Sequence, residues 1–382
     1  MRFFMLLWLF LIPGLYAEED TFLDQFFDDE DGQLDVSEWL GNVYGFLPTP
    51  IIITGPTFGF GAGVNVLFLH DKFMNESSES GRYIPPSLTG IVYAGTENGT
   101  QIGAAYHIGF WMQDTLRTST FVGYPSVNLD FYPDIPIVGE REITMNLEGW
   151  AAYQEVKYRM GDSNIFLGGN YLYYGITSTP KEDPIYIPTE WLIKKFSTAA
   201  LAAVAEYDSR DSIFTPDRGL YAKLVAARYD EVVGSDYEFW NYRGKLFYFH
   251  SLSDSLTLGL RSEAQSVDGS APYFMYPSVD IRGIAHARYQ GQHTFLGETE
   301  LRWDVTNRWS LIGFIGSGKA FGEDILRREL SFSDASWRTS GGAGFRYNIA
   351  KKFKLRMGLD VAFGPEENSV YITAGHAWDA FY

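Results

Sequence analysis

The chain has 382 residues, no cysteine, a formal net charge of −18 and 17% aromatic residues. This charge argues against a nucleic-acid partner, because phosphate binding needs clustered Lys and Arg. The lack of cysteine removes thiolate nucleophiles and thiolate metal ligands, although it is compatible with export. A mean hydropathy of −0.13 is too low for a bundle of membrane helices.

The first residues, MRFFMLLWLFLIPGLYA, are typical of a secretory signal. Arg2 precedes an apolar run from Phe3 to Ile12, and Ala17 stands before the first acidic residue. We therefore expect residues 1–17 to be a signal peptide. The apolar run is too short for a membrane anchor, which needs about 20 residues. Because no longer apolar run follows, the mature chain is either soluble or crosses a membrane as a barrel.

Residues 18–49 form an acidic segment. Ten acidic side chains lie between Glu18 and Glu38, and no Lys or Arg occurs between Arg2 and Lys72. Such composition predicts a mobile periplasmic extension.

Part of this segment imitates a calcium-binding loop. The oxygen ligands at loop positions three, five and twelve would be Asp29, Asp31 and Glu38, and the turn glycine at position six would be Gly32. Position one is Phe27, which has no oxygen to offer, and no flanking pair of helices is evident. A solvated acidic linker is favoured over a calcium site.

Residues 50–382 alternate between apolar and polar side chains. In GETELRWDV, residues 297–305, every second residue from Thr299 is suited to an apolar face, and Glu298, Glu300, Arg302 and Asp304 share the other face. A soluble sandwich also alternates, but its strands usually have about five or six residues. Strands of nine to fourteen residues here, with abundant aromatics and a signal peptide, predict an all-β, antiparallel transmembrane barrel with a polar lumen.

The alternation predicts sixteen strands, and an even count agrees with single-chain bacterial barrels. In chain order the expected ranges are 57–69, 87–97, 100–113, 116–122, 126–131, 143–158, 164–176, 196–208, 219–229, 239–250, 254–267, 294–305, 308–321, 337–349, 352–363 and 369–378. Both chain ends then face the periplasm. The long connections 70–86, 177–195, 268–293 and 322–336 are all expected on the extracellular side.

Several stretches resemble a known family. YDSRDSIFTPDRGLY, VDIRGI, ETELRWDV, GGAGFRYNIAKKFKLRMGLDVAFG and VYITAGHAW are similar to the barrel of the BamA/TamA superfamily, the bacterial surface antigens, over about residues 50–378. Members usually carry POTRA domains ahead of the barrel. Only 32 residues separate Ala17 from Pro50, so the chain resembles the sub-group that lacks them.

The resemblance implies a location in the outer membrane of a Gram-negative bacterium. It further implies insertion, assembly or translocation of proteins or lipids there. The implied partners are outer-membrane lipid and client outer-membrane or exported proteins, and no cofactor is implied. The alternative is a passive or selective pore, since a barrel of this size can hold an aqueous channel.

The resemblance also implies a loop that folds into the lumen. In the family an Arg-Gly-aromatic motif occupies the extracellular loop before the fifth-last strand; Arg282 and Gly283 match it, and Ile284 replaces the aromatic residue. An Arg inside a barrel needs a carboxylate partner, and Glu300 points into the lumen from the next strand. The family's second acidic partner falls at Gly316, so we expect a single lock between Arg282 and Glu300. From the residues alone, a solvated Arg282 on a surface loop is an equal alternative.

The closing strand resembles the family's C-terminal assembly signal. Val370, Ile372 and Trp378 are expected to alternate toward lipid. Because DAFY follows Trp378, either Trp378 or Tyr382 is the terminal aromatic residue of the signal.

The start of the barrel favours a weak seam between the first and last strands. Gly59, Gly61 and Gly63 share one face of the expected first strand, and Pro56 removes a ladder donor near its start. The glycines could instead make space for the lumen loop or allow curvature.

The sequence contains no recognisable catalytic motif. The segment GFIGSGKA approaches a phosphate-binding loop, but Ala320 stands where Ser or Thr must reach the metal. The six His are scattered, and no nucleophile elbow or Ser-His-Asp grouping occurs. We therefore expect no enzyme, no cofactor and no metal centre.

Overall fold

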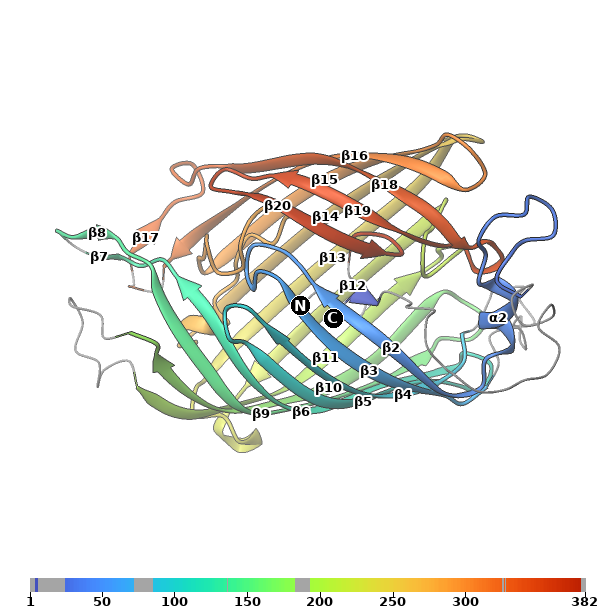
Figure 1. The fold of residues 1–382 in the computed structure, drawn as a ribbon. Helices are drawn as coiled ribbons and strands as arrows, with labels where there is room; N and C mark the ends of the chain where they lie inside the picture. Colours follow the sequence, from blue (N-terminus) through green and yellow to red (C-terminus); the bar gives the residue numbers. More distant parts are fainter. Residues whose placement is uncertain are drawn as a thin grey trace.

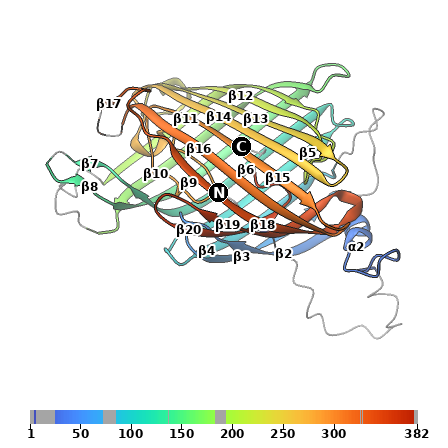
Figure 2. The ribbon, with the colours of Figure 1, turned by 90° about the horizontal axis from the view of Figure 1, so that it is seen from above.

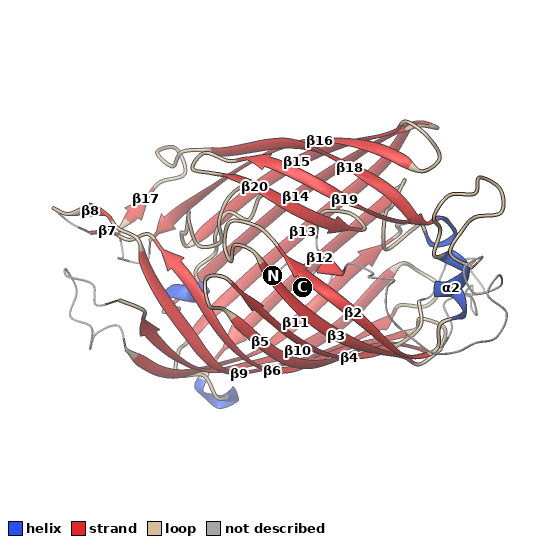
Figure 3. Ribbon diagram, in the orientation of Figure 1, coloured by secondary structure: helices blue, strands red, loops and turns tan. Residues whose placement is uncertain are grey.

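A computed structural model describes residues 4–5 (backbone only), 25–71, 85–135, 137–182, 193–324, 326 and 328–378. Sixteen strands form an antiparallel, nearly closed barrel (Figures 1 and 3). The barrel strands are β2 (Gly45–Ile53), β3 (Gly61–Leu69), β4 (Leu88–Thr96), β5 (Gln101–Trp111), β6 (Leu116–Phe131), β9 (Ile143–Arg159), β10 (Ile165–Pro180), β11 (Lys194–Asp208), β12 (Gly219–Tyr229), β13 (Phe239–Ser253), β14 (Leu256–Gly269), β15 (His293–Asp304), β16 (Trp309–Glu323), β18 (Arg338–Ala350), β19 (Leu355–Phe363) and β20 (Asn368–Ala374).

The remaining elements are short. They are β1 (Phe4–Met5), α2 (Ser37–Asn42), the hairpin of β7 (Asp134–Ile135) and β8 (Gly139–Glu140), β17 (Glu329–Leu330), and the 3₁₀ turns η1 (Glu231–Val233), η2 (Tyr273–Met275) and η3 (Lys351–Phe353). β1 lies inside the expected signal peptide and pairs with Ile51 and Ile52 of β2. The rest of that signal peptide lies outside the described residues. In the described part of the chain, no helix is long and apolar enough to cross a membrane.

Each barrel strand pairs with the next barrel strand along the chain, from β2 to β20. Figure 2 shows the resulting wall from a second direction. The boundary between β2 and β20 is called the seam below. Although both strands are fully described, no backbone ladder joins them.

The two ends of the barrel differ. One end, called the turn end, carries α2 and the short turns 254–255, 305–308 and 351–354. The opposite end, called the loop end, carries the long connections 181–193, 270–292 and 324–337. This sorting agrees with the long connections expected from the sequence after residue 143.

The wall is apolar outside and charged inside. In β15, Leu301 and Trp303 are 43% and 52% exposed, whereas Glu298 and Arg302 are 3% and 6% exposed. A soluble protein would show the reverse, so the outer face is suited to lipid and the inner face to a polar lumen.

The expected number of strands is confirmed, although the expected set contained two errors that cancel in the count. One strand was missed, and another was divided into two. The first strand is β2, which the sequence analysis missed because Pro48 and Pro50 argue against a strand. Proline is tolerated where its missing donor faces no partner, and β2 pairs with a barrel neighbour on one side only. The expected strands 116–122 and 126–131 are one strand, β6, whose ladder to β9 skips only Tyr124 and Pro125.

Three expectations change with this shift. The barrel begins at Gly45 rather than at residue 50, and the connection 70–86 belongs to the turn end rather than the extracellular end. Residues 25–44, expected to be mobile, dock on the turn end through Arg308 and Lys351.

Candidate functional site

Arg282 lies at the centre of a buried ionic cluster, although it comes from a loop. Its side chain is 0% exposed. Its Nε donates to Glu298 Oε1 at 2.9 Å, its Nη1 donates to Asp360 Oδ2 at 2.9 Å, and its Nη2 also donates to Glu298. The guanidinium lies over the Phe314 ring, 3.6 Å from the ring centroid. The charge of Arg282 is therefore compensated on several sides.

The expected partner Glu300 is in ion-pair contact, with its Oε2 at 2.7 Å from Arg282 Nη2. The expected pairing of Arg282 with Glu300 is thus present as an ion pair, but that oxygen is not the acceptor of the expected hydrogen bond. Glu298, two residues earlier on the same face of β15, takes this role. The alternation of residues 297–305 carried the signal, because Glu298 and Glu300 share a face.

The lock is also not single. Asp360, on the inner face of β19, binds Arg282 and accepts from Arg346 at 2.6 and 2.8 Å. Gly316 is not an empty partner position, because a Cβ there would lie 3.1 Å from Glu298 Cγ and 3.0 Å from Ile281. Its missing side chain makes room for the cluster.

Gly283 is required by the same geometry. Its φ is +87°, a conformation that costs a side-chain-bearing residue free energy. A Cβ there would lie 2.5 Å from Ser340 Oγ, and the Gly283 N–H donates to Tyr371 Oη at 2.7 Å. Ile284, in place of the family's aromatic residue, packs in a buried apolar cluster of this loop.

The loop of residues 270–292 contacts strands on opposite sides of the barrel. Tyr273 hydrogen bonds to Ser178 of β10 at 2.6 Å, whereas Gly283 reaches Tyr371 of β20. β10 and β20 are separated by about half of the strand order. The loop therefore reaches across the barrel from β10 to β20, and we infer that it occupies the lumen.

The end of the chain also turns inward. Val370 is 50% exposed on the outer face, Ile372 follows it on the same face, and β20 ends at Ala374. Trp378 is not part of the strand and does not face lipid, which corrects the expected alternation: it is 3% exposed and packs on Phe247 and Phe249. Gly375, with φ of +79°, allows this change of direction. Tyr382 lies outside the described residues.

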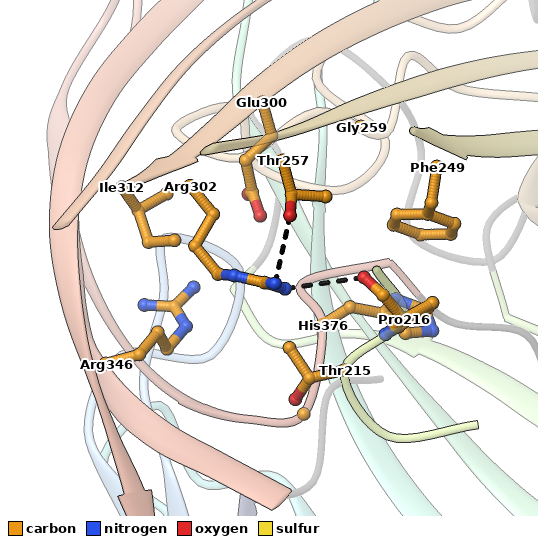
Figure 4. A pocket seen from close by; sticks show the side chains of 11 residues that line it. Thr215, Pro216, Phe249, Thr257, Gly259, Glu300, Arg302, Ile312, Arg346 and His376 are labelled. Atoms are coloured by element: carbon orange, nitrogen blue, oxygen red, sulfur yellow. Dashed lines mark hydrogen bonds between the residues drawn. The ribbon is translucent and has the colours of Figure 1, made fainter. Parts of the chain in front are cut away.

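A narrow pocket lies between the lock and the turn end (Figure 4). Arg302 crosses it and donates to Thr257 Oγ1 at 3.1 Å and to the Pro216 carbonyl at 3.3 Å. His376 and Glu300 also line it. The connection 209–218 and the chain end therefore meet the inner face of β14 and β15.

A second polar cavity lies along another part of the inner wall. Its ionic side chains are paired across β6, β9, β11 and β12: Arg117 and Lys157 contact Glu206, and Lys223 contacts Glu155. In the described residues, no group of His, Cys, Asp or Glu is arranged to hold a metal. In the acidic segment, Asp31 and Asp35 contact Arg308.

The seam is the second feature of the site. Ile372 N–H donates to Thr54 Oγ1 across it at 3.3 Å. The expectation that Gly59, Gly61 and Gly63 lie in the first strand is wrong. Gly61 and Gly63 lie in the second barrel strand, β3, and Gly59 lies in the turn before it. A Cβ at Gly63 would lie 2.5 Å from Ala94 Cβ, so close contact with β4 accounts for this glycine.

Comparisons with known proteins agree with this architecture. BamA from Haemophilus ducreyi lacking POTRA domains 1–3 aligns with a TM-score of 0.59 and 9% identity, over 87% of this chain and 70% of that chain. CdiB from Escherichia coli aligns with a TM-score of 0.57 and 8% identity, over 86% of this chain and 62% of that chain. Identities this low show the fold alone, and this chain spans less than two thirds of CdiB.

The comparison with curated proteins finds no match. The sequence profile of the Omp85 superfamily domain, however, matches residues 114–377, which is more than half of the chain. The matched range contains the lock residues Arg282, Glu298 and Asp360 as well as β20. The chain belongs to the Omp85 superfamily.

Proposed function

We propose that this protein resides in the outer membrane of a Gram-negative bacterium and helps proteins to insert into or cross that membrane through its seam. Its turn end then faces the periplasm and its loop end the exterior. Outer-membrane lipid and client proteins are its partners. The proposal follows the Omp85 family, and BamA and CdiB are the structural neighbours that support it.

The observation that carries the proposal is the unpaired seam. β2 and β20 each have one barrel neighbour, β3 and β19, and no ladder joins them to each other. In the described residues the seam-side edge of β2 pairs only with the two-residue β1, at Ile51 and Ile52, which lies within the expected signal peptide. Unpaired strand edges are templates for an incoming strand. Pro48 and Pro50 further limit the ladder that β2 can form on its free side.

A removable cross-link tests this role. The Thr54→Cys, Ile372→Cys double variant places two thiols at the contact between these residues across the seam, in a chain that has no other cysteine. The assay measures how fast an unfolded, small outer-membrane barrel protein folds into lipid vesicles that contain the variant. We expect acceleration by the reduced variant and none by the oxidised one.

Two results would contradict the proposal. Equal acceleration by the oxidised and reduced forms would show that the seam need not open. No acceleration by the unmodified protein would show that it does not assist insertion of such a client. Matched single variants, Thr54→Cys and Ile372→Cys, control for the substitutions themselves.

A passive or selective pore is the second candidate, and the polar cavity beside Lys157 and Glu206 favours it. The inferred lumen loop argues against it, because it fills the space that solutes would need. Ion conductance in planar bilayers separates the two. A large open-state conductance of the unmodified protein would favour the pore, whereas conductance that appears only after deletion of residues 270–290 would favour a plugged machine.

A further inference from the structure

Residues 25–44 fold into a small unit at the turn end. Phe27 and Leu34 form an antiparallel bridge around a turn in which Gly32 has a φ of +64°. The helix α2 follows, and the chain then enters β2 at Gly45. The unit is therefore rooted on the β2 side of the seam.

A single arginine from the other side of the seam binds this unit. Arg308, in the turn between β15 and β16, has a side chain only 1% exposed. Its Nη2 donates to Asp28 Oδ2 at 2.6 Å, its Nε to Asp31 Oδ2 at 2.7 Å and its Nη1 to Asp35 Oδ2 at 2.6 Å. Every nitrogen of the guanidinium thus meets a carboxylate from residues 25–44, which is the strong, charge-assisted kind of contact.

Contacts to the end of β18 and to the turn between β18 and β19 add to this arginine. Val36 N–H donates to the Ile349 carbonyl at 2.8 Å, and Lys352 N–H donates to Ser37 Oγ at 3.1 Å. Lys351 Nζ lies 2.5 Å from Glu30 Oε2. The position of the unit is therefore fixed by directional bonds as well as by charge.

The apolar contacts join both sides of the seam. Phe26, Val36 and Leu40 are buried in one cluster with Leu69 at the end of β3 and with Phe353 in η3. Burial of large apolar side chains stabilises such a contact. Docking of residues 25–44 thus packs strand ends from the two sides of the seam against one surface.

The seam needs such a bridge at this end. β20 ends at Ala374, only two residues beyond the Ile372 contact with Thr54, and the chain turns inward at Gly375. β2, by contrast, continues from Ile53 to Gly45 toward the turn end. Most of the seam-side edge of β2 therefore lies beyond the end of β20. β1 pairs with this edge at Ile51 and Ile52, and the part nearer Gly45 leads to the docked unit.

We propose that residues 25–44 are a latch that holds the turn end of the seam closed, and that Arg308 is the residue that keeps this latch docked. Release of Asp28, Asp31 and Asp35 from Arg308 frees the β2 root from the turns of β15–β16 and β18–β19 and widens the seam. This inference rests on the proposed function only in the purpose it gives to seam opening. The latch itself concerns the structure of the protein. It is therefore tested by the mobility of residues 25–44 and by the distance across the seam, rather than by client insertion.

Spin labels on engineered cysteines give the test, because the chain has no native cysteine. A label at Glu38→Cys, exposed on α2, reports docking. A label pair at Phe46→Cys in β2 and Leu359→Cys in β19, both outward and 76% and 38% exposed, reports seam width. In the full-length protein in lipid vesicles, Arg308→Gln should convert the immobile label on α2 to a mobile one and shift the Phe46–Leu359 distance distribution to longer values.

Lys354→Gln is the matched control. Lys354 is a basic residue in the neighbouring turn that pairs with Asp211 and Asp217 rather than with the aspartates that bind Arg308. It should leave both signals unchanged.

If Arg308→Gln does not assemble, the Asp28→Asn, Asp31→Asn, Asp35→Asn triple variant removes the carboxylates that bind Arg308 without touching the barrel wall. A label on α2 that stays immobile, or one that becomes mobile while the seam distance stays the same, would overturn the latch. Neither result bears on whether the protein assists client insertion, which the cross-link assay decides.

Discussion

Trp378 donates its indole N–H to Glu298 Oε1 at 3.1 Å, and the same oxygen accepts from Arg282. The residue at the inward-turned end of the chain and the lumen loop therefore share one carboxylate. β20 forms one edge of the seam, so this carboxylate links the seam strand to the lock. A shift of the chain end changes the electrostatic surroundings of Arg282 directly.

Trp378→Phe tests this link, since it keeps an aromatic ring and removes the donor. A hydrogen bond to a charged group contributes about 1.5 to 3 kcal/mol, so the variant should unfold at a correspondingly lower urea concentration. Trp303→Phe is the control, because Trp303 is 52% exposed on the outer face. Equal midpoints for the two variants would mean that the indole N–H does not stabilise the fold.

Arg282→Ala should loosen the lumen loop. Removing one member of a buried ionic cluster costs about 3 to 5 kcal/mol, although water in the lumen lowers this figure. We expect faster proteolysis of residues 270–292 from the exterior and higher bilayer conductance. An unmodified protein whose loop is cut equally fast would show that Arg282 does not hold it.

The carboxylates around Arg282 should differ in how much they contribute to the free energy of unfolding. Glu298 is fully buried and hydrogen bonded, whereas Glu300 is 14% exposed and its Oε2 accepts no hydrogen bond. Glu298→Gln should therefore lower the free energy of unfolding more than Glu300→Gln. In double-mutant cycles with Arg282→Ala, both pairs should be less destabilised than the sum of the single variants. Additive effects for Glu298 would contradict the assignment.

Gly283→Ala should destabilise the loop through its backbone. The positive φ and the contact with Ser340 Oγ together predict a loss of about 1 to 3 kcal/mol in the free energy of unfolding, measured in urea. Gly313→Ala in β16 is the matched control, because a Cβ there meets nothing within 4 Å. A loss of similar size at Gly313 would remove the special role of Gly283.

Alternation along the strands was enough to predict the barrel and much of its lock. It put Glu298 and Glu300 on one face of β15, which is where the structure has them. It could not tell which carboxylate receives the hydrogen bonds of Arg282, because that depends on how a loop of irregular backbone packs against the strands.

Proline and glycine residues account for two features that the sequence analysis missed, the first strand and the inward turn after β20. Pro48 and Pro50 argue against a strand in general, yet they suit a strand that has one free edge. Gly375 permits the turn that takes Trp378 from the expected lipid face into the interior. Docking of residues 25–44 was missed because their charge predicts disorder, and the compensating Arg308 lies far along the chain.

The latch should open in acid. Hydrogen bonds hold the pKa of the aspartates below the usual range: the Glu30 N–H acts first at Asp28, and Arg308 acts first at Asp31. At Asp35 burial raises the pKa, but the hydrogen bonds from Ser37 and Arg308 together outweigh it, so this pKa is lowered too.

Because the docked pKa values lie below the undocked value of about 3.9, docking is fully stabilised above that pH and is lost as the pH falls through the docked values. A spin label at Glu38→Cys should therefore stay immobile from pH 8 to about pH 4 and become mobile only as the pH falls further. Arg308 and Lys351 stay charged throughout, so the carboxylates alone set the direction. The same label in the Arg308→Gln background should be mobile at every pH. A transition centred between pH 6 and 7 would instead point to a histidine and contradict the aspartate contacts as the cause.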